Sequence, residues 1–427
     1  MITPYSCRHG ICIGCLTPRA YRRVRDLHTG ELHDLVGQLT QTCVSAASGP
    51  PTLDAQPCKE SPVTATATAT ATALALTEAT LAEEFGEELD RIRSEVIATR
   101  GADDARYIRA VIATQRGLEA GGRIALAISL FPPAWAAGTA MLSLAKILEN
   151  MELGHNILHG QWDWMGDPAI HSTTWEWDFL TPAAAWKHTH NHLHHTWTNV
   201  VDRDRDLGYV VFRMSADQSW RPRHLAQPLY NFLLAPLFEW GIALYDLEPD
   251  VVAAGGKPWR SFLDDVSGFL AKATRQLAKD YVIFPLLAGP SALPCLLGNL
   301  TANTVRNLWT HTIIFCGHFP GDVQTFTEEH IEGETRGEWY LRQIQGSANI
   351  EGGPLFHVLS GNLGHQIEHH AFPDLPSNRY AEIAAQVREL CERYGIPYVT
   401  GPLWRQYRST WGRILRFAVP VGGLAAR

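Results

Sequence analysis

Histidine constrains this 427-residue chain more than any other residue type, because many of its 19 histidines fall into clusters that share one spacing. The segment GHNILHG carries His155 and His159, four residues apart. The segments KHTHNHLHHTW and GHQIEHHAFPDLP each contain a histidine followed, after three residues, by a His-His pair. Imidazoles packed this densely are hard to bury, because each buried ring nitrogen needs a hydrogen-bond partner. The repeated spacing therefore indicates a shared ligand.

Metal ions are the ligands that fit this pattern best. Residues four apart lie on one face of a helix, so both imidazoles of such a pair can reach the same ion. Imidazole suits iron, copper, nickel and zinc, and the histidines outnumber the ligands that one ion takes. Two ions are therefore expected. Nitrogen-rich coordination beside apolar segments favours oxygen-activating iron over a closed tetrahedral zinc site. For each cluster alone, solvated surface histidines remain the alternative.

Four apolar stretches accompany the clusters, at residues 124–148, 225–247, 281–300 and 304–319. The first is long enough for one membrane crossing, although Pro132 and Pro133 interrupt it. Two hairpins would place the histidines on one side of the bilayer, and the positive-inside bias makes that side cytoplasmic. We therefore expect a multi-pass membrane protein with a cytoplasmic catalytic face. Long buried helices of a soluble protein are the alternative.

Composition limits the partners and the domain organisation. A net charge of -8 provides no basic surface for nucleic acid. The Thr/Ala-rich tract 58–77 offers no large side chain to bury and is predicted to be a linker. Residues 78–121 carry apolar side chains at helical spacing and are predicted to be an amphipathic helical region. We expect the histidine-bearing domain at 122–400 and a C-terminal tail at 401–427.

Residues from about 120 to 400 resemble the membrane fatty acid desaturase family, whose three boxes read H-x3/4-H, H-x2/3-H-H and H/Q-x2/3-H-H. The segment GNLGHQIEHHAFPDLPSNRY is similar to the third box of bacterial acyl-lipid or acyl-CoA desaturases. The resemblance implies a mainly α fold, with a four-helix transmembrane part and a cytosolic helical cap. It also implies a di-iron centre, a fatty acyl substrate, and O2-dependent insertion of a double bond. Electrons would come from a ferredoxin reductase or a flavoprotein.

The resemblance also implies which residues bind the metal. The three boxes give the ligands His155, His159, His190, His194, His195, His365, His369 and His370. In the acyl-CoA branch a further histidine, preceded four residues earlier by asparagine, completes the site. Asn307 and His311 fit that pattern, but His318 lies on roughly the same helix face, so either or both histidines are candidates. His192 in place of His190 also remains open.

Carboxylates are expected to orient the imidazoles through their second ring nitrogen. Glu152 and Glu368 adjoin the boxes, and Glu176 and Asp178 are weaker candidates. The loop 202–206, which reads DRDRD, either meets a substrate head group or is solvated and internally paired.

A cysteine motif precedes the linker. Cys7, Cys12 and Cys15 have the plant-type 2Fe–2S spacing, and Cys43 supplies a fourth thiolate. Residues 1–57 resemble the C-terminal half of a plant-type ferredoxin domain, with a zinc site as the alternative. Only six residues precede Cys7, so the first hairpin of the β-grasp fold is missing. We expect either a misassigned start or a remnant that does not hold the cluster unaided.

Other reactions use the same kind of histidine boxes. Desaturases, hydroxylases, alkane monooxygenases and ketolases share the oxidant, and motifs do not report the fate of the substrate radical. The third box favours desaturation. A non-catalytic metal-binding or electron-carrying protein is the alternative from another class.

Overall fold

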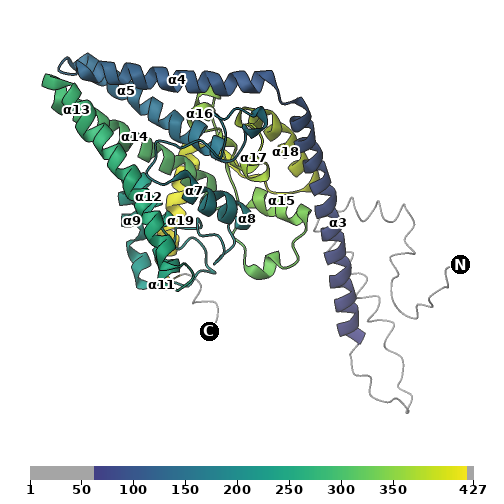
Figure 1. Cartoon of the computed structure of the whole chain (residues 1–427). Helices are drawn as coiled ribbons and strands as arrows, with labels where there is room; N and C mark the ends of the chain where they lie inside the picture. Colours follow the sequence, from purple (N-terminus) through teal and green to yellow (C-terminus); the bar gives the residue numbers. More distant parts are fainter. Residues whose placement is uncertain (1–61, 421–427) are drawn as a thin grey trace, which may run out of the picture. The chain divides into compact units, whose positions relative to one another are not determined.

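A computed structural model of the chain describes the backbone of residues 62–420 and the side chains of residues 79–420. The residues from Ala79 onward form one compact unit, most of which is helical (Figure 1). This confirms the mainly α fold for the described residues. Within them only β1 (Asn349–Glu351) and β2 (Thr400–Pro402) are strands, paired in parallel with Ile350 opposite Gly401.

Two helical hairpins lie side by side (Figure 1). The first consists of α4 (Ala102–Ala127) and α5 (Pro132–Leu148). In the second, α12 (Trp259–Leu277), η7 (Ala278–Ile283) and α13 (Phe284–Leu287) precede the turn η8 (Gly289–Ser291), and α14 (Ala292–His318) follows it. A Cβ on Gly138 would lie 3.0 Å from the carbonyl oxygen of Gly122, so glycine allows α4 and α5 to approach closely.

Both α5 and α14 run from a hairpin turn toward the histidines. α5 continues through the π-helix η2 (Glu149–His155) into α6 (Asn156–Leu158), and α14 ends at His318. Because the two helices are parallel neighbours, residues at matching heights along them meet.

A second apolar core forms where the end of α3 (Pro62–Thr99) packs on α15 (Arg336–Gln345), α17 (Gln366–Ala371) and α18 (Tyr380–Tyr394). The helical spacing predicted from the sequence is reflected here, because Phe85, Leu89, Ile92 and Val96 are all buried. The close packing against α15 uses Gly86 and Gly337, since a Cβ on Gly86 would lie 2.9 Å from the Cα of Gly337.

The remaining helices are η3 (Asp163–Met165), α7 (Ala183–Trp186), the π-helix η4 (Lys187–His194), α8 (His195–Trp197), η5 (Pro222–Ala226), α9 (Gln227–Leu234), η6 (Ala235–Leu237), α10 (Phe238–Asp246), α11 (Pro249–Ala253), η9 (Glu328–Ile331), α16 (Pro354–Leu359), η10 (Leu363–His365), η11 (Ser377–Arg379) and α19 (Leu403–Ala418).

The apolar stretches expected to be four crossings are divided differently in the structure. Pro132 starts α5 rather than interrupting a helix, because a proline in the first turn removes no helical hydrogen bond. Residues 225–247 are split among α9, η6 and α10. Residues 301–303, which separate the third and fourth apolar stretches in the sequence, lie within the single helix α14. None of the helices in the described range has both the length and the hydropathy to span a bilayer.

The Thr/Ala-rich tract also differs from expectation. Its composition predicts a linker at 58–77, but residues 62–77 have helical backbone as the first part of α3. The division of the chain into domains otherwise stays a prediction.

The contact between α3 and α15 is testable with glycine variants. A Cβ on Gly337 would lie 1.9 Å from the carbonyl oxygen of Ala82, a backbone atom that cannot move by itself. Gly337→Ala should therefore lower the free energy of unfolding by about 1–3 kcal/mol, the usual cost of overpacking. Urea denaturation followed by circular dichroism measures this change.

The matched control is Gly412→Ala in α19, where nothing lies within 4 Å of an added Cβ. There alanine should raise the free energy of unfolding by about 0.5–1 kcal/mol through helix propensity. Equal effects of the two substitutions would contradict the close α3–α15 contact.

Candidate metal centre

Two groups of histidines, all of them buried except the half-buried His159, come together in the structure. Group A consists of His155, His159, His190 and His369, and group B consists of His194, His318 and His370. Within each group, one nitrogen from every ring lies within 4.8 Å of the others. Asp206 forms a third such set with His190 and His194. The ligand atoms are therefore close enough to share metal ions.

His195 lies between the two groups. Its ring centroid is 4.6 Å from that of His159 and 4.4 Å from that of His370, on which it stacks. Both of its ring nitrogens are buried without a hydrogen-bond partner in the described structure. It can therefore serve either group.

Two π-helical segments deliver the histidines of the first two boxes. His155 ends η2, and His159 follows at the end of α6. His190 and His194 lie in η4, and His195 begins α8. π turns are rare in helices overall, but they occur frequently at functional sites. The extra residue in such a turn changes the direction in which nearby side chains point. The neighbouring His188 and His192 are not among the buried rings of either group, so His192 does not replace His190 in group A.

Most of the imidazoles in the two groups are held through Nδ1. The carboxylate of Asp206 accepts from Nδ1 of His190 at 3.2 Å, and that of Asp204 accepts from Nδ1 of His194 at 3.0 Å. Three further rings are anchored by neutral oxygens: His155 by Asn156 at 3.0 Å, His370 by Gln343 at 3.0 Å and His369 by Tyr380 at 3.3 Å. Such a contact fixes the tautomer and leaves Nε2 free to bind a metal.

The free nitrogens fit a metal. Within the described residues, Nε2 is buried and unpartnered in His159, His190, His194, His369 and His370. A buried polar atom without a partner costs free energy, and such atoms are rare. Their convergence on two points is what nitrogen coordination of two ions requires.

Electrostatics keep most of these rings neutral. Burial, followed by the neighbouring imidazoles, lowers the pKa of His190, His195 and His370 well below the ordinary value. Burial lowers the pKa of His155 to about 4. Neutral imidazole is the form that binds metal. His194 differs, because Asp204 outweighs the effect of burial and raises its pKa.

Besides His195, three further predicted ligands lie outside both groups. His365 stacks on His357 with ring centroids 4.1 Å apart. His311 contacts Asn231 at 3.0 Å, and Asn307 donates to the carbonyl oxygen of Pro236 at 2.9 Å. His311 and His318 share a helix face, but about 10 Å separates them along α14 at the α-helical rise. Of the two candidate histidines on this helix, His318 belongs to group B and His311 lies in neither group.

Gln366 occupies the place expected for His365. Its amide nitrogen lies 3.0 Å from Nε2 of His318, while Nδ1 of His318 is buried and unpartnered. The third box allows glutamine at its first position, and Gln366 with His369 and His370 has the spacing Q-x2-H-H. That spacing was the signal that could have identified it.

Neither Glu152 nor Glu368 hydrogen-bonds to a ring of either group in the described structure, although Glu152 reaches His155 through Asn156. Glu152 accepts from Asn156, the partner of His155, at 3.3 Å, and Glu368 accepts from Asn349 at 2.8 Å. Burial raises the pKa of both carboxyl groups to about 7. Glu176 and Asp178 instead pair with lysines.

The sequence did not predict most of the residues that hydrogen-bond to the imidazole rings. Asp204 and Asp206 belong to the loop 202–206, where a head-group contact or a solvated surface is the expectation from the sequence. Their alternation, two and four residues into an otherwise polar loop just after the second box, was the available signal. Gln343 and Tyr380 gave no signal, because they approach from distant parts of the chain.

A cavity adjoins group A and reaches His155 and His190. Its walls are mostly aromatic and apolar, and they include Trp177, Phe179, Trp186, Tyr209, Phe238 and Ile242. Its polar lining includes Asn150, Thr189, Asp206, Tyr245, Asp246 and Thr310. Burial raises the pKa of Asp246 to about 7, and this carboxylate accepts hydrogen bonds from Thr181 and Thr189. An apolar cavity beside the histidines can place a hydrocarbon chain next to bound metal.

The assignment of candidate ligands to groups A and B is testable by metal binding. His369→Ala removes a group A nitrogen and should weaken transition-metal affinity by at least about 10-fold, the scale seen even for outer partners. His365→Ala is the matched control, because its ring stacks on His357 away from both groups. Metal titration of the purified variants, read out by elemental analysis, measures both, and equal losses would contradict this placement.

The predicted cysteine ligands Cys7, Cys12, Cys15 and Cys43 lie outside the described residues. The ferredoxin-like fragment at 1–57 and its 2Fe–2S cluster therefore stay predictions.

Comparison with known proteins agrees with the geometry. Residues 131–402 match the family model described as fatty acid desaturase. The chain is 48% identical over 349 residues to the NADPH-dependent stearoyl-CoA 9-desaturase of Mycobacterium tuberculosis, covering 81% of this chain and 82% of that protein. It is 25% identical over 285 residues to the sn-1 linoleoyl-lipid 6-desaturase of a Synechocystis species, covering 64% and 77%. The chain therefore belongs to the fatty acid desaturase family and is an oxidoreductase of lipid metabolism.

Proposed function

We propose that groups A and B each hold one iron ion and that the adjoining cavity binds the acyl chain being desaturated. The observation that carries this proposal is the convergence of buried, unpartnered imidazole nitrogens beside an aromatic cavity. The proposed ligands are His155, His159, His190 and His369 at one ion and His194, His318 and His370 at the other, with His195 between them. When bound there, the iron pair would supply O2 activation for removing hydrogen from an unactivated chain.

The protein's own residues orient and isolate this chemistry. Asp204 and Asp206 hold two rings through Nδ1, so that Nε2 faces the ions. Trp177 and Trp186 line the cavity, where Trp186 packs beside His155 and His190, and both indoles exclude water from the acyl chain. A rigid, dry wall favours one position of the chain relative to the metals.

The substrate is proposed from the relatives. The Mycobacterium tuberculosis protein is named for stearoyl-CoA and for position 9. By similarity, we propose a long saturated acyl-CoA as substrate and the same double-bond position for this chain. The name of the Mycobacterium tuberculosis protein also includes NADPH-dependent. We therefore propose an NADPH-oxidising reductase, with a ferredoxin or flavoprotein carrier, as the source of electrons for this chain.

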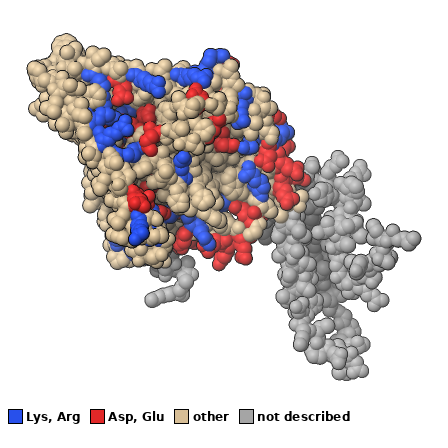
Figure 2. Space-filling view, viewed as in Figure 1, with Lys and Arg blue, Asp and Glu red and all other residues tan. Residues whose placement is uncertain are grey.

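Membrane association is proposed from the exposed surface. Residues 124–145 and 281–305 contain no Lys, Arg, Asp or Glu, and one end of the hairpins is free of charge in Figure 2. Large apolar side chains are exposed there, including Ile124, Phe131, Leu286 and Leu287. A contiguous apolar surface of this kind marks a membrane or protein contact. We propose that it enters the bilayer, with the metal groups on the cytoplasmic side.

The proposed activity is testable by expression of the full chain with an NADPH-dependent reductase in a host lacking its own desaturase. New monounsaturated chains should appear by mass spectrometry. His194→Ala should reduce them by at least about 100-fold, because groups that act as a unit cost most of the rate when one is lost. His192→Ala, in the same cluster but outside both metal groups, should leave them unchanged. Hydroxylated products would assign a hydroxylase instead, and bound iron without oxidised lipid would favour a metal-storage protein.

The membrane proposal predicts the fractionation of the same cells. The wild-type chain should remain with the membranes after an alkaline carbonate wash, which removes proteins held only by charge. Replacing Phe131, Leu286 and Leu287 with aspartate should shift it toward the wash, because an aspartate costs about 2.5–3.5 kcal/mol in the bilayer centre. Recovery of wild type in the wash would refute the proposal.

A further inference from the structure

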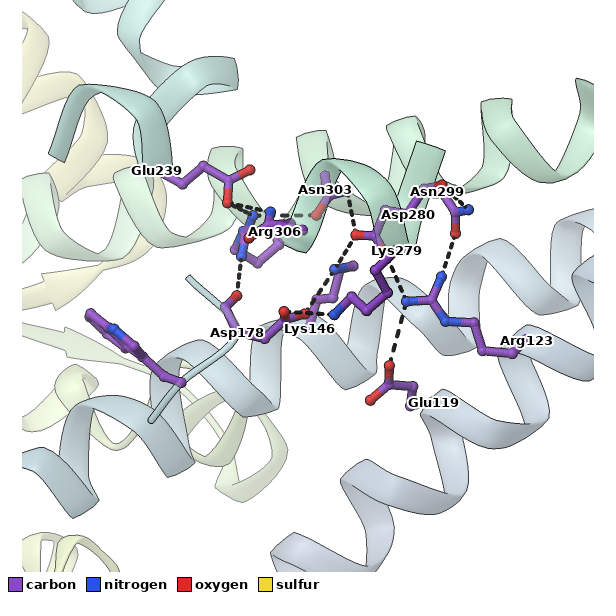
Figure 3. Close-up of polar contacts among 12 residues, drawn as sticks. Glu119, Arg123, Lys146, Asp178, Glu239, Lys279, Asp280, Asn299, Asn303 and Arg306 are labelled. Atoms are coloured by element: carbon purple, nitrogen blue, oxygen red, sulfur yellow. Dashed lines mark hydrogen bonds and ion pairs between the residues drawn. The ribbon is translucent and has the colours of Figure 1, made fainter. Parts of the chain in front are cut away.

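A layer of mostly buried ion pairs joins the two hairpins, α10 and the loop that carries Asp178 (Figure 3). Arg306 on α14 pairs with Glu239 on α10 at 2.6 Å, and the two side chains are 0% and 3% exposed. Lys146 on α5 pairs with Asp280 at 2.9 Å and with Asp178 at 3.1 Å. These ion pairs therefore connect helices and a loop that are far apart in the sequence.

The layer has a fixed place relative to the metal groups. Along α5 and its continuation, Lys146 comes first, then Asn150, then His155. Along the parallel α14, Arg306 comes first, then Thr310, and His318 ends the helix. Asn150 and Thr310 both line the cavity. They link α14 to the continuation of α5, because the hydroxyl of Thr310 donates to the amide oxygen of Asn150 at 2.8 Å. The cavity therefore lies between the histidines and the ion pairs.

Helix α10 also carries an ion-pair residue next to a residue that lines the cavity. On α10, Glu239 lies one turn before Ile242, which lines the cavity. Neither Glu239 nor Arg306 lines the cavity, but on α10 and α14 their pair lies about one turn from the lining residues Ile242 and Thr310, on the side away from the histidines. Gln276 also donates to the carboxylate of Glu239 at 2.8 Å, so this buried group is doubly held.

The irregular loop 175–182 is held by the same layer. Trp177 and Phe179 line the cavity, while Asp178 between them turns away and accepts from Lys279 at 2.6 Å. The backbone oxygen of Asp178 accepts from Arg306 at 3.3 Å, and the guanidinium of Arg306 lies 5.1 Å from the centre of the Phe179 ring. Arg306 therefore packs behind the wall that this loop forms, through its contacts with Asp178 and with the lining residue Phe179.

We propose that the ion pair of Arg306 and Glu239 is the end-stop of the acyl cavity and so sets the length of chain that the enzyme accepts. An acyl chain that passes the histidines would have to separate buried charges to go further, and an uncompensated buried charge is costly. This rests on the proposed function. Arg306 and Glu239 are positioning residues, because neither touches the reacting carbons.

The test is a paired variant, Arg306→Met/Glu239→Leu, expressed as the full chain in the desaturase-deficient host supplied with saturated fatty acids of graded length. Replacing both charges with apolar groups of similar volume avoids stranding either one. The proportion of product from chains longer than the wild-type preference should rise about tenfold, the scale of one methylene in an apolar pocket. Thr310→Leu, which fills the same end, should lower the longest products by a similar factor.

The control pair is Arg379→Met/Asp104→Leu. It removes a partly buried pair of 2.6 Å between η11 and α4, in which Arg379 is 20% and Asp104 1% exposed. This pair contacts no cavity residue among those described, so its product lengths should match wild type. Iron content is measured for every variant. If the Arg306 pair variant loses iron, Thr310→Leu decides alone. An unchanged length profile in iron-loaded variants of an active wild type overturns this inference, whereas an inactive wild type overturns the proposed function.

Discussion

The cost of burying imidazole nitrogens without partners constrains the rest of this structure. Most rings in groups A and B keep one nitrogen free in the interior, and the surrounding protein satisfies only the other. Such an arrangement is unfavourable until something binds the free nitrogens. Binding to the folded state then contributes directly to stability, which couples metal uptake to folding. The carboxylates and amides at Nδ1 keep the rings oriented in the meantime.

Helix α14 connects this constraint to the rest of the molecule. Along its length it supplies Arg306 to the ion pairs, Thr310 to the cavity and His318 to group B. A shift along its axis would change all three contacts together. Its neighbour α5, with the π-helix that continues it, provides the same order with Lys146, Asn150 and His155. The shared order along the two helices relates the position of the cavity to that of the two histidine groups.

Local spacing along the chain was enough to predict part of this structure. The three-residue spacing between histidines identified segments whose rings converge in the structure, and helical spacing identified the buried face around Phe85 and Leu89. Contacts between distant segments were not predictable in this way, because Gln343 and Tyr380 reach their histidines only after the fold brings them together. His311 and His318 share a face of α14, so the sequence did not separate them. Only their different positions along the helix axis place His318, and not His311, in group B. The boundaries at Pro132 and within α14 were wrong because apolar content does not reveal where a helix begins.

The π-helical geometry of η2 and η4 has a consequence for how this chain can change over time. A π turn holds one residue more than an α turn, so deleting a single residue there would restore ordinary winding and change which side chains of the segment face the two histidine groups. Loops elsewhere absorb such length changes easily. Gene lineages of this protein are therefore expected to vary freely in composition around the two boxes but to tolerate no insertion or deletion inside them.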